Sequence, residues 1–317
     1  MSHRLAIVVP CYNEEAVLRI TASELSGILN RMVDEQLIDR DSYVLMVNDG
    51  SKDGTWQVIE DLHRSNPLLY KGIDLAHNRG HQNALLAGLM EVINHCDAAI
   101  SIDADLQDDP LAMIEMVKRW HEGAEIVYGV RSSRETDTWF KRTTAHAFYS
   151  FQRSMGVDTV YDHADYRLMS QRALILLSEY REVNLFLRGI VPQIGLTTAI
   201  VEYKRGVRAA GESKYPLSKM LSFSIDGITS FSARPMRLIF LTGFTFLLIT
   251  LLVAVYVFVA YLTGRTIAGW SSLMLSVWFL GSLILMGIGI VGEYIGKIFL
   301  EVKARPRYTI RQRLTED

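Results

Sequence analysis

Two carboxylates, Asp103 and Asp105, follow a short apolar run that begins at Ala98. The run predicts a strand buried on both faces, so the carboxylates should lie at its carboxyl end, where open α/β sheets bind their ligands. Mg²⁺ and Mn²⁺ prefer oxygen ligands and commonly bind through one or two carboxylates together with substrate phosphates. The pattern therefore indicates a divalent-metal site. The alternative is an acidic loop in which Asp108 begins the helix expected at Pro110.

A second carboxylate turn, NDGSKDGT, follows the apolar run 43–47. Its first glycine permits a tight turn, and Asp53 together with Thr55 can cap the helix expected next. Asp53 therefore has a structural explanation, whereas we expect none for Asp49. A third polar stretch, HNRGHQNALLAGL, opens a helix with Gly80 at its turn. A helix N-terminus at that point would suit an anionic ligand.

The elements that would position these turns alternate between strands and helices. Apolar runs predict strands over residues 5–10, 43–47, 71–75, 98–102 and 125–130. Apolar residues at helical spacing predict helices over residues 15–32, 56–63 and 110–121, and another after Gly80. This alternation predicts a Rossmann-like, mostly parallel α/β sheet with nucleotide-sized sites along one edge. The turns contain no G-x-G-x-x-G sequence and no Walker loop, which disfavours dinucleotide-binding and P-loop proteins.

Composition narrows the class of protein. The chain has 317 residues, 49% of them hydrophobic, and a formal net charge of −2, so we expect no nucleic acid as a partner. Cys11 and Cys96 are its two cysteines. That number argues against a disulfide framework and for a reducing compartment, where both cysteines would be small buried side chains.

Two uncharged runs, 238–262 and 270–292, are long enough to cross a membrane. They predict a C-terminal hairpin of two transmembrane helices. The loop between them carries one charged residue, Arg265, whereas Arg234 and Arg237 precede the first run and a basic tail follows the second. By the positive-inside rule both termini face the cytoplasm, and we expect no signal peptide before the first strand.

These runs divide the chain into four expected parts. They are a cytoplasmic α/β domain (1–210), juxtamembrane amphipathic helices (211–237), two transmembrane helices (238–296) and a basic cytoplasmic tail (297–317). The juxtamembrane part could instead be an ordinary connecting helix. A further basic helix is expected over 140–155, near the membrane surface or as a solvated face. Glycines recur along the second span and favour packing within the hairpin or between subunits, so we expect a homo-oligomer.

Five motifs occur in a characteristic order: PCYNEE, VNDGSKDGT, NRGHQNALLAGL, DADLQDD and GVR. In this order they resemble the inverting family 2 glycosyltransferases of the GT-A fold. With the C-terminal hairpin, the chain is similar to the polyprenyl-phosphate glycosyltransferases, the branch of dolichol-phosphate-mannose synthase and the bacterial GtrB-type enzymes. The resemblance covers essentially the whole chain.

The resemblance implies a role for individual residues. The residues implied to line the nucleoside are Pro10, Tyr12, Glu14, Val47 and Asp49, with the Ala104 backbone beside the ribose. The residues implied to hold Mg²⁺ or Mn²⁺ are Asp103 and Asp105, with Gln107 in the outer shell. The residues implied to handle phosphate are Arg131, Arg208 and Lys214. The family usually has two aspartates before the glycine of the second motif, whereas this chain has Asn48 and Asp49.

The motif YDHADYRLM resembles the acceptor-side motif of the GtrB-like branch, in which Asp165 matches the catalytic base. The alternative is a carboxylate paired with Arg167. A lipid phosphate is already largely ionised at neutral pH, so a strong base is less necessary than for a hydroxyl acceptor. His163, His77 and His81 are expected to pack or donate hydrogen bonds, because no second histidine stands at metal-ligand spacing.

The function that follows is inverting transfer of a hexose from a nucleotide sugar to undecaprenyl phosphate at the cytoplasmic membrane face. By resemblance to the GtrB-type branch the donor is UDP-glucose, and the product would serve cell-envelope glycosylation at the bacterial inner membrane. Two alternatives remain open. One is a processive polysaccharide synthase, whose Q-x-x-R-W motif is incomplete here because Met116 precedes Arg119 and Trp120. The other is a non-catalytic nucleotide-binding membrane scaffold.

Overall fold

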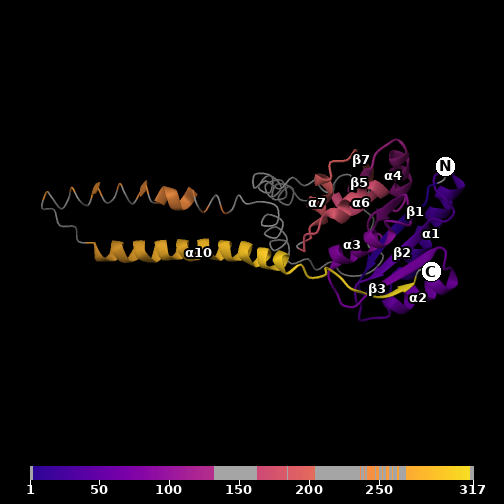
Figure 1. Cartoon of the computed structure of the whole chain (residues 1–317), viewed down its shortest axis with the longest axis horizontal. Coiled ribbons are helices and arrows are strands. Elements are labelled where there is room, and N and C mark those ends of the chain that lie inside the picture. The colour runs from indigo at the N-terminus through magenta and orange to yellow at the C-terminus, as the bar shows by residue number, and fades with distance from the viewer. Residues whose placement is uncertain are drawn as a thin grey trace. The chain divides into compact units, whose positions relative to one another are not determined.

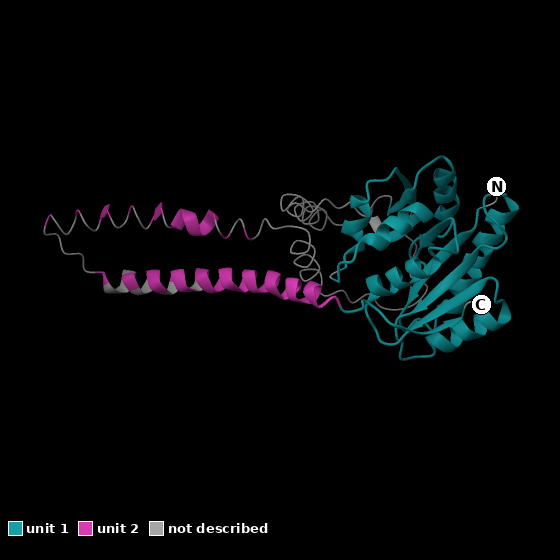
Figure 2. Cartoon of the chain, viewed as in Figure 1, with its two compact units in different colours: residues 1–147, 159–216, 305–317 teal, residues 148–158, 217–304 magenta. Residues whose placement is uncertain are grey.

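A computed structural model describes residues 3–131, 163–183, 185–203 and 269–314, together with single residues and short runs between 236 and 263. The chain divides into two compact units (Figure 2). Unit 1 comprises residues 1–147, 159–216 and 305–317, and unit 2 comprises residues 148–158 and 217–304. The expected helices over 140–155 and 214–237 lie almost entirely outside the described residues.

Unit 1 is built on a sheet in which eight strands are described (Figure 1). They are β1 (Leu5–Cys11), β2 (Tyr43–Asn48), β3 (Tyr70–Leu75), β4 (Ala98–Ser101), β5 (Ile126–Arg131), β6 (His163–Ser170), β7 (Thr198–Tyr203) and β8 (Ile310–Leu314). Their order across the sheet is β7-β5-β6-β4-β1-β2-β3-β8. The four strands β4, β1, β2 and β3 are mutually parallel neighbours, which confirms the expected α/β sheet.

Helices cover both faces of this sheet. Alternate residues of β1 pack in one hydrophobic core with α1 (Leu18–Asp34), α2 (Thr55–Ser65) and α4 (Ala112–His121). On the opposite face α3 (His81–Val92) lies so close to the strands that a Cβ atom at Gly88 would clash with Val8 Cγ1. The remaining helices of unit 1 that the structure describes are α6 (Gln171–Glu179) and α7 (Leu187–Gln193).

Two strands come from stretches that we did not expect to form strands. β6 lies in the middle of the sheet and runs antiparallel to both β4 and β5. β8, the yellow strand in Figure 1, lies at the edge of the sheet and pairs antiparallel with β3. Part of the expected basic tail is therefore a strand of the sheet of unit 1. Its arginines pair with acidic side chains of that sheet and of α3, which explains how so charged a segment is held there.

In unit 2, α10 (Trp270–Lys303) contains the second predicted span and continues beyond it. Within the described part of the chain, the segment Phe279–Lys303 of this helix is long and apolar enough to cross a membrane, and an 18-residue window within it has a mean hydropathy of 1.8. The first predicted span, 238–262, is described only in part, and its residues 241–246 are helical. The rings of Phe246 and Phe279 lie 6.0 Å apart. The two-helix hairpin itself stays a prediction.

The close approach of α3 to the sheet gives a test of this packing. Gly88→Ala would push a methyl group into Val8 and Val47, and overpacking of this kind costs about 1–3 kcal/mol. We expect a lower midpoint of thermal unfolding for the full chain in detergent. Gly27→Ala is the matched control, because Gly27 lies exposed on α1 with nothing within 4 Å of a new Cβ. Equal midpoints for the two variants would contradict this packing.

Candidate active site

The polar turns meet at one edge of the sheet. β1, β2 and β4 are parallel, so the residues that follow them lie at the same end. Asp103 and Asp105 follow β4, and the Asp105 Oδ1 atom accepts the backbone N–H of Gln107 at 3.2 Å. The D-x-D sequence is therefore placed where the apolar pattern predicted.

The residues implied to line the nucleoside lie at the same edge. Pro10 and Val47 are register partners on the neighbouring strands β1 and β2, and both are buried. Tyr12 is 42% exposed beyond the end of β1. The Ala104 carbonyl accepts the Thr21 hydroxyl at 2.6 Å, so this part of its backbone is engaged within the fold. These contacts are all within the fold, and the nucleoside-binding role of the residues stays a prediction.

Asp49 has a structural role that we did not expect. Its two carboxylate oxygens accept the backbone N–H groups of Arg79, at 2.6 Å, and Gly80, at 2.9 Å. Burial raises the pKa of Asp49, and these two N–H donors oppose that shift. The carboxylate thus fixes the turn that begins α3, where Gly80 has the positive φ of 84° that favours glycine. Asp53 accepts the backbone N–H and the hydroxyl of Thr55, the first residue of α2, while Gly54 and not Asp53 or Thr55 occupies the N-cap position.

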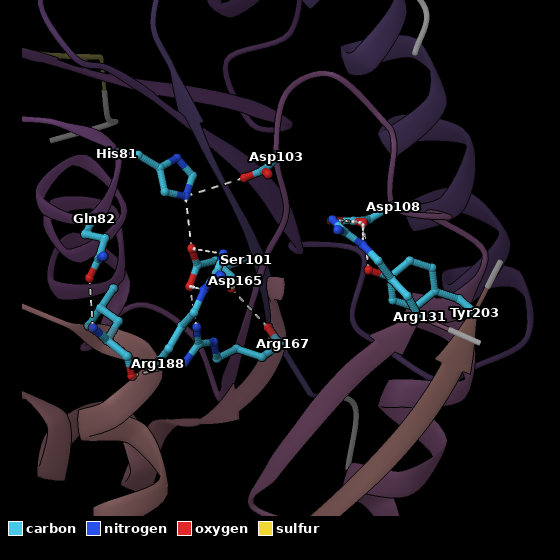
Figure 3. A network of polar contacts seen from close by, with 11 residues as sticks. His81, Gln82, Ser101, Asp103, Asp108, Arg131, Asp165, Arg167, Arg188 and Tyr203 are labelled. Carbon is cyan, nitrogen blue, oxygen red and sulfur yellow. Dashed lines mark hydrogen bonds and ion pairs between the residues drawn. The ribbon is translucent and has the colours of Figure 1, made fainter. Parts of the chain in front are cut away.

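Asp165 lies on β6 at the centre of a polar network (Figure 3). It is 6% exposed, and its Oδ1 atom accepts Arg167 Nη2 at 2.6 Å. Arg188 of α7 donates its Nη2 to Oδ2 at 3.2 Å. His81, the first residue of α3, places Nε2 3.4 Å from Asp165 Oδ2 and 3.5 Å from Asp103 Oδ1. The structure therefore connects the acceptor-side motif to the D-x-D sequence through one histidine.

The charges of this network decide what Asp165 can do. Burial opposes its negative charge, but the hydrogen bond from His81 and the guanidinium groups of Arg188 and Arg167 hold the pKa of Asp165 well below its usual range. A general base works best when its pKa lies near the operating pH. Asp165 is therefore better suited to orienting its cationic neighbours than to accepting a proton. Asp165 therefore pairs with Arg167 and also lies in the candidate site, so the two alternatives for this residue do not exclude each other.

His81 and Arg188 were not identified from the sequence as site residues. The pKa of His81 is raised, because its hydrogen bond to Asp165 and the charges of Asp103 and Asp165 outweigh the opposing effect of burial. The glycine turn before His81 was the available indication, since it brings the start of α3 to the sheet edge. Nothing in the sequence indicated that Arg188 belongs to the site, because no motif precedes it.

A second network lies around Asp108, which is 1% exposed. Its Oδ1 atom accepts Arg131 Nη2 at 3.0 Å and the Tyr203 hydroxyl at 2.6 Å. The alternative that Asp108 begins the helix is therefore wrong, because Asp109 accepts the Leu111 N–H before α4 instead. Arg131 is present at the end of β5 as predicted, paired with a buried carboxylate. Arg208 and Lys214, the other implied phosphate-handling residues, lie outside the described residues.

The chemistry of Asp103 and Asp105 fits a divalent metal. Burial raises the pKa of Asp103 to about 6, and the nearby charges of Asp165, Asp108 and Asp105 add to this effect while His81 opposes it. A bound cation would relieve the crowding of these carboxylates. Among the described residues no group of three or more His, Cys, Asp or Glu side chains is arranged to hold a metal. Two carboxylates nevertheless suit Mg²⁺ or Mn²⁺ when substrate phosphates and water supply the other ligands.

The Asp165 network predicts a pH-dependent contribution to stability. Asp165→Asn leaves the buried Arg167 without its carboxylate, so we expect a loss of about 3 kcal/mol in unfolding free energy at pH 7. Because the folded-state pKa of Asp165 lies below its unfolded value, this contribution is lost as the pH falls below about 4. The gap between native and variant unfolding midpoints should therefore narrow in acid. Asp61→Asn, in an exposed ion pair with Arg19, should cost less than about 1 kcal/mol, and an equal effect would contradict this account.

Comparison with known proteins agrees with this geometry. Residues 6–177 match the model described as Glycosyl transferase family 2. A Bacillus subtilis protein named "uncharacterized glycosyltransferase YkoT" is 53% identical over 96% of this chain and 90% of its own length. The bactoprenol glucosyl transferase of Shigella phage SfX is 36% identical over 98% of this chain and 99% of its own.

A solved structure shares the fold. Mannosyl-3-phosphoglycerate synthase from Rubrobacter xylanophilus superimposes with a TM-score of 0.50 at 17% identity, and 74% of each chain is covered. The motifs, the sheet and the match over more than half of the chain lead to one conclusion. This protein belongs to glycosyl transferase family 2 and is a glycosyltransferase.

Proposed function

We propose that this enzyme transfers glucose, with inversion, from UDP-glucose to undecaprenyl phosphate at the cytoplasmic face of the bacterial inner membrane. The observation that carries the proposal is the connection of Asp103 to Asp165 and Arg188 through His81 at one edge of the sheet. That connection joins the D-x-D turn, which is suited to a metal ion and a diphosphate, to Arg188 and His81, which are suited to a second phosphate. The name of the phage relative, a bactoprenol glucosyl transferase, supports the choice of donor sugar and acceptor lipid.

On the donor side, Asp103 and Asp105 would hold Mg²⁺ or Mn²⁺, with Gln107 beside them. The ion would supply electrostatic stabilisation of the negative charge on the departing diphosphate. Arg131 would act on the same charge, together with Arg208 and Lys214. Tyr12 and the turn at Asp49 would contact the nucleoside.

On the acceptor side, the attacking group is an oxygen of the lipid phosphate. Its second pKa is near ~6, so it is largely deprotonated at pH 7 and needs no strong base. Asp165, held anionic by its neighbours, would keep Arg188 and His81 in place. The side chains of these two residues are 44% and 43% exposed, so both can meet a phosphate oxygen. Their positive charge would orient the nucleophile toward the anomeric carbon.

The apolar helix in unit 2 gives the proposal its membrane component. A polyprenyl phosphate carries its reactive group at the depth of the lipid headgroups, so the enzyme must work at the bilayer surface. The apolar segment of α10 has the length that a membrane span needs. We propose that the chain is multi-pass, with both termini cytoplasmic, and that it self-associates through its membrane helices.

Transfer can be tested with membranes that contain the full chain. They would be incubated with undecaprenyl phosphate and, in turn, labelled UDP-glucose, UDP-galactose, UDP-N-acetylglucosamine and GDP-mannose. We expect an acid-labile labelled lipid with UDP-glucose. A labelled lipid from another donor alone would contradict the assignment of glucose, and no labelled lipid from any donor would contradict the acceptor.

Removal of a metal-holding carboxylate tests the donor side. Asp105→Ala should lower the transfer rate roughly 10²-fold or more, because charge on the leaving diphosphate would lose its stabilisation. The amount of protein in the membrane should be unchanged. Asp109→Asn is the matched control, since its side-chain oxygen can still accept the Leu111 N–H, and it should keep a near-native rate. Native turnover by Asp105→Ala would exclude the metal site proposed here.

A further inference from the structure

β8 brings an arginine to the sheet through a bulge. Asp74 of β3 pairs with Gln312, whereas its neighbour Leu75 pairs with Ile310, so Arg311 is the extra residue on β8. An extra residue of this kind locally bends the strand and re-aims a side chain. The Arg311 side chain forms an ion pair with the Asp74 carboxylate, donating its Nε to Oδ2 at 2.6 Å.

Asp74 is an unusual residue to find at this position. It is fully buried, at 0% exposure, and is the penultimate residue of β3, whose other residues are mostly apolar. A buried carboxylate requires hydrogen bonds and a compensating charge. Arg311 supplies the charge at Oδ2, and the Asn48 side-chain amide donates to Oδ1 at 2.7 Å. Asp74 therefore links the C-terminal strand to the end of β2.

From Asn48 the contacts continue into the turns implied to bind the nucleoside. The Asn48 Oδ1 atom accepts the backbone N–H of Ser51 at 3.2 Å. The Ser51 hydroxyl in turn accepts the backbone N–H of Asn13 at 3.0 Å, and Asn13 Oδ1 accepts the backbone N–H of Lys52 at 2.9 Å. The turn after β2 and the turn after β1 are thus held against each other. Asn48 can serve both partners only while its amide keeps one orientation, which Asp74 sets.

We propose that Arg311 is a positioning residue for the donor nucleotide. Acting through Asp74 and Asn48, it holds the turn 48–51 against the turn 11–15, between which the nucleoside is proposed to bind. The inference rests on the proposed function for that role. It makes the segment that follows the apolar helix a part of the donor site, although it lies more than 200 residues away from both turns.

Arg313 offers a matched control on the same strand. It is two residues further along β8, with a side chain 53% exposed against 61% for Arg311. It pairs with Glu91 near the end of α3, at 2.7 Å, and not with the donor turns. A general weakening of β8 would affect both variants alike, whereas positioning of the donor turns would distinguish them.

The experiment compares full-length Arg311→Ala, Arg311→Lys and Arg313→Ala with the native chain. Amide hydrogen exchange without nucleotide should speed up at residues 48–52 and 11–15 in Arg311→Ala but not in Arg313→Ala. With UDP-glucose varied at saturating undecaprenyl phosphate, Arg311→Ala should raise the donor KM about tenfold, as expected for loss of one or two hydrogen bonds. Its kcat and its acceptor KM should stay within about twofold.

Arg311→Lys keeps the positive charge but loses the planar fork, so it should fold and raise the donor KM about threefold. It carries the comparison if Arg311→Ala fails to accumulate. Unchanged exchange in the two turns, or an equal rise in donor KM with Arg313→Ala, would overturn the inference. A lower unfolding midpoint of Arg311→Ala with an unchanged donor KM would also overturn it, because Arg311 would then stabilise the fold without positioning the donor. Failure of the proposed function appears separately, as a native chain that binds no UDP in Mg²⁺. That result would overturn the donor role of Arg311, whereas the exchange comparison without nucleotide would still show whether Arg311 holds the two turns together.

Discussion

A buried carboxylate must have its charge compensated, and three buried carboxylates of unit 1 meet this requirement through contacts that also position the candidate site. Asp165 lies inside the sheet and draws in Arg167 from its own strand, Arg188 from α7 and His81 from α3. Gln82, next to His81, also accepts the backbone N–H of Leu187, next to Arg188. Two helices far apart in sequence are thus held around one carboxylate, and the side chains of His81 and Arg188 meet there, with His81 also beside Asp103 of the D-x-D turn.

The same rule recurs at two other carboxylates. Asp108 and Asp74 are also buried, and each is held by one arginine and one neutral donor. Arg311 is 237 residues away from Asp74 along the chain, whereas Arg131 is 23 residues away from Asp108. These pairs do more than offset the cost of burial, because each one fixes a turn at the carboxyl edge of the sheet. These contacts hold the turns without any substrate, and preorganisation of this kind reduces the entropic cost of binding.

Local sequence patterns were sufficient for the first half of the sheet. The strands at β1, β2, β3, β4 and β5 and the helices that follow the first four were predicted within a few residues, because hydrophobic periodicity and turn residues are local properties. β6 and β8 were not predicted. β6 carries Asp165 and Arg167, and β8 carries Arg311 and Arg313, so neither reads as a buried or half-buried strand. In β6 the buried Asp165 is compensated by Arg167 of the same strand and by Arg188, whereas the arginines of β8 are more than half exposed and pair with Asp74 and Glu91.

The sequence by itself determined the family, the α/β class, the D-x-D turn and the apolar C-terminal region, since each depends on residue types and spacings along the chain. Tertiary structure alone decided which carboxylates are buried and what they pair with. It joined His81 and Arg188 to Asp165, paired Arg131 with Asp108, and brought Arg311 to Asp74. The physical reason is that ion pairing depends on distance and burial in space, and chain separation carries no information about either.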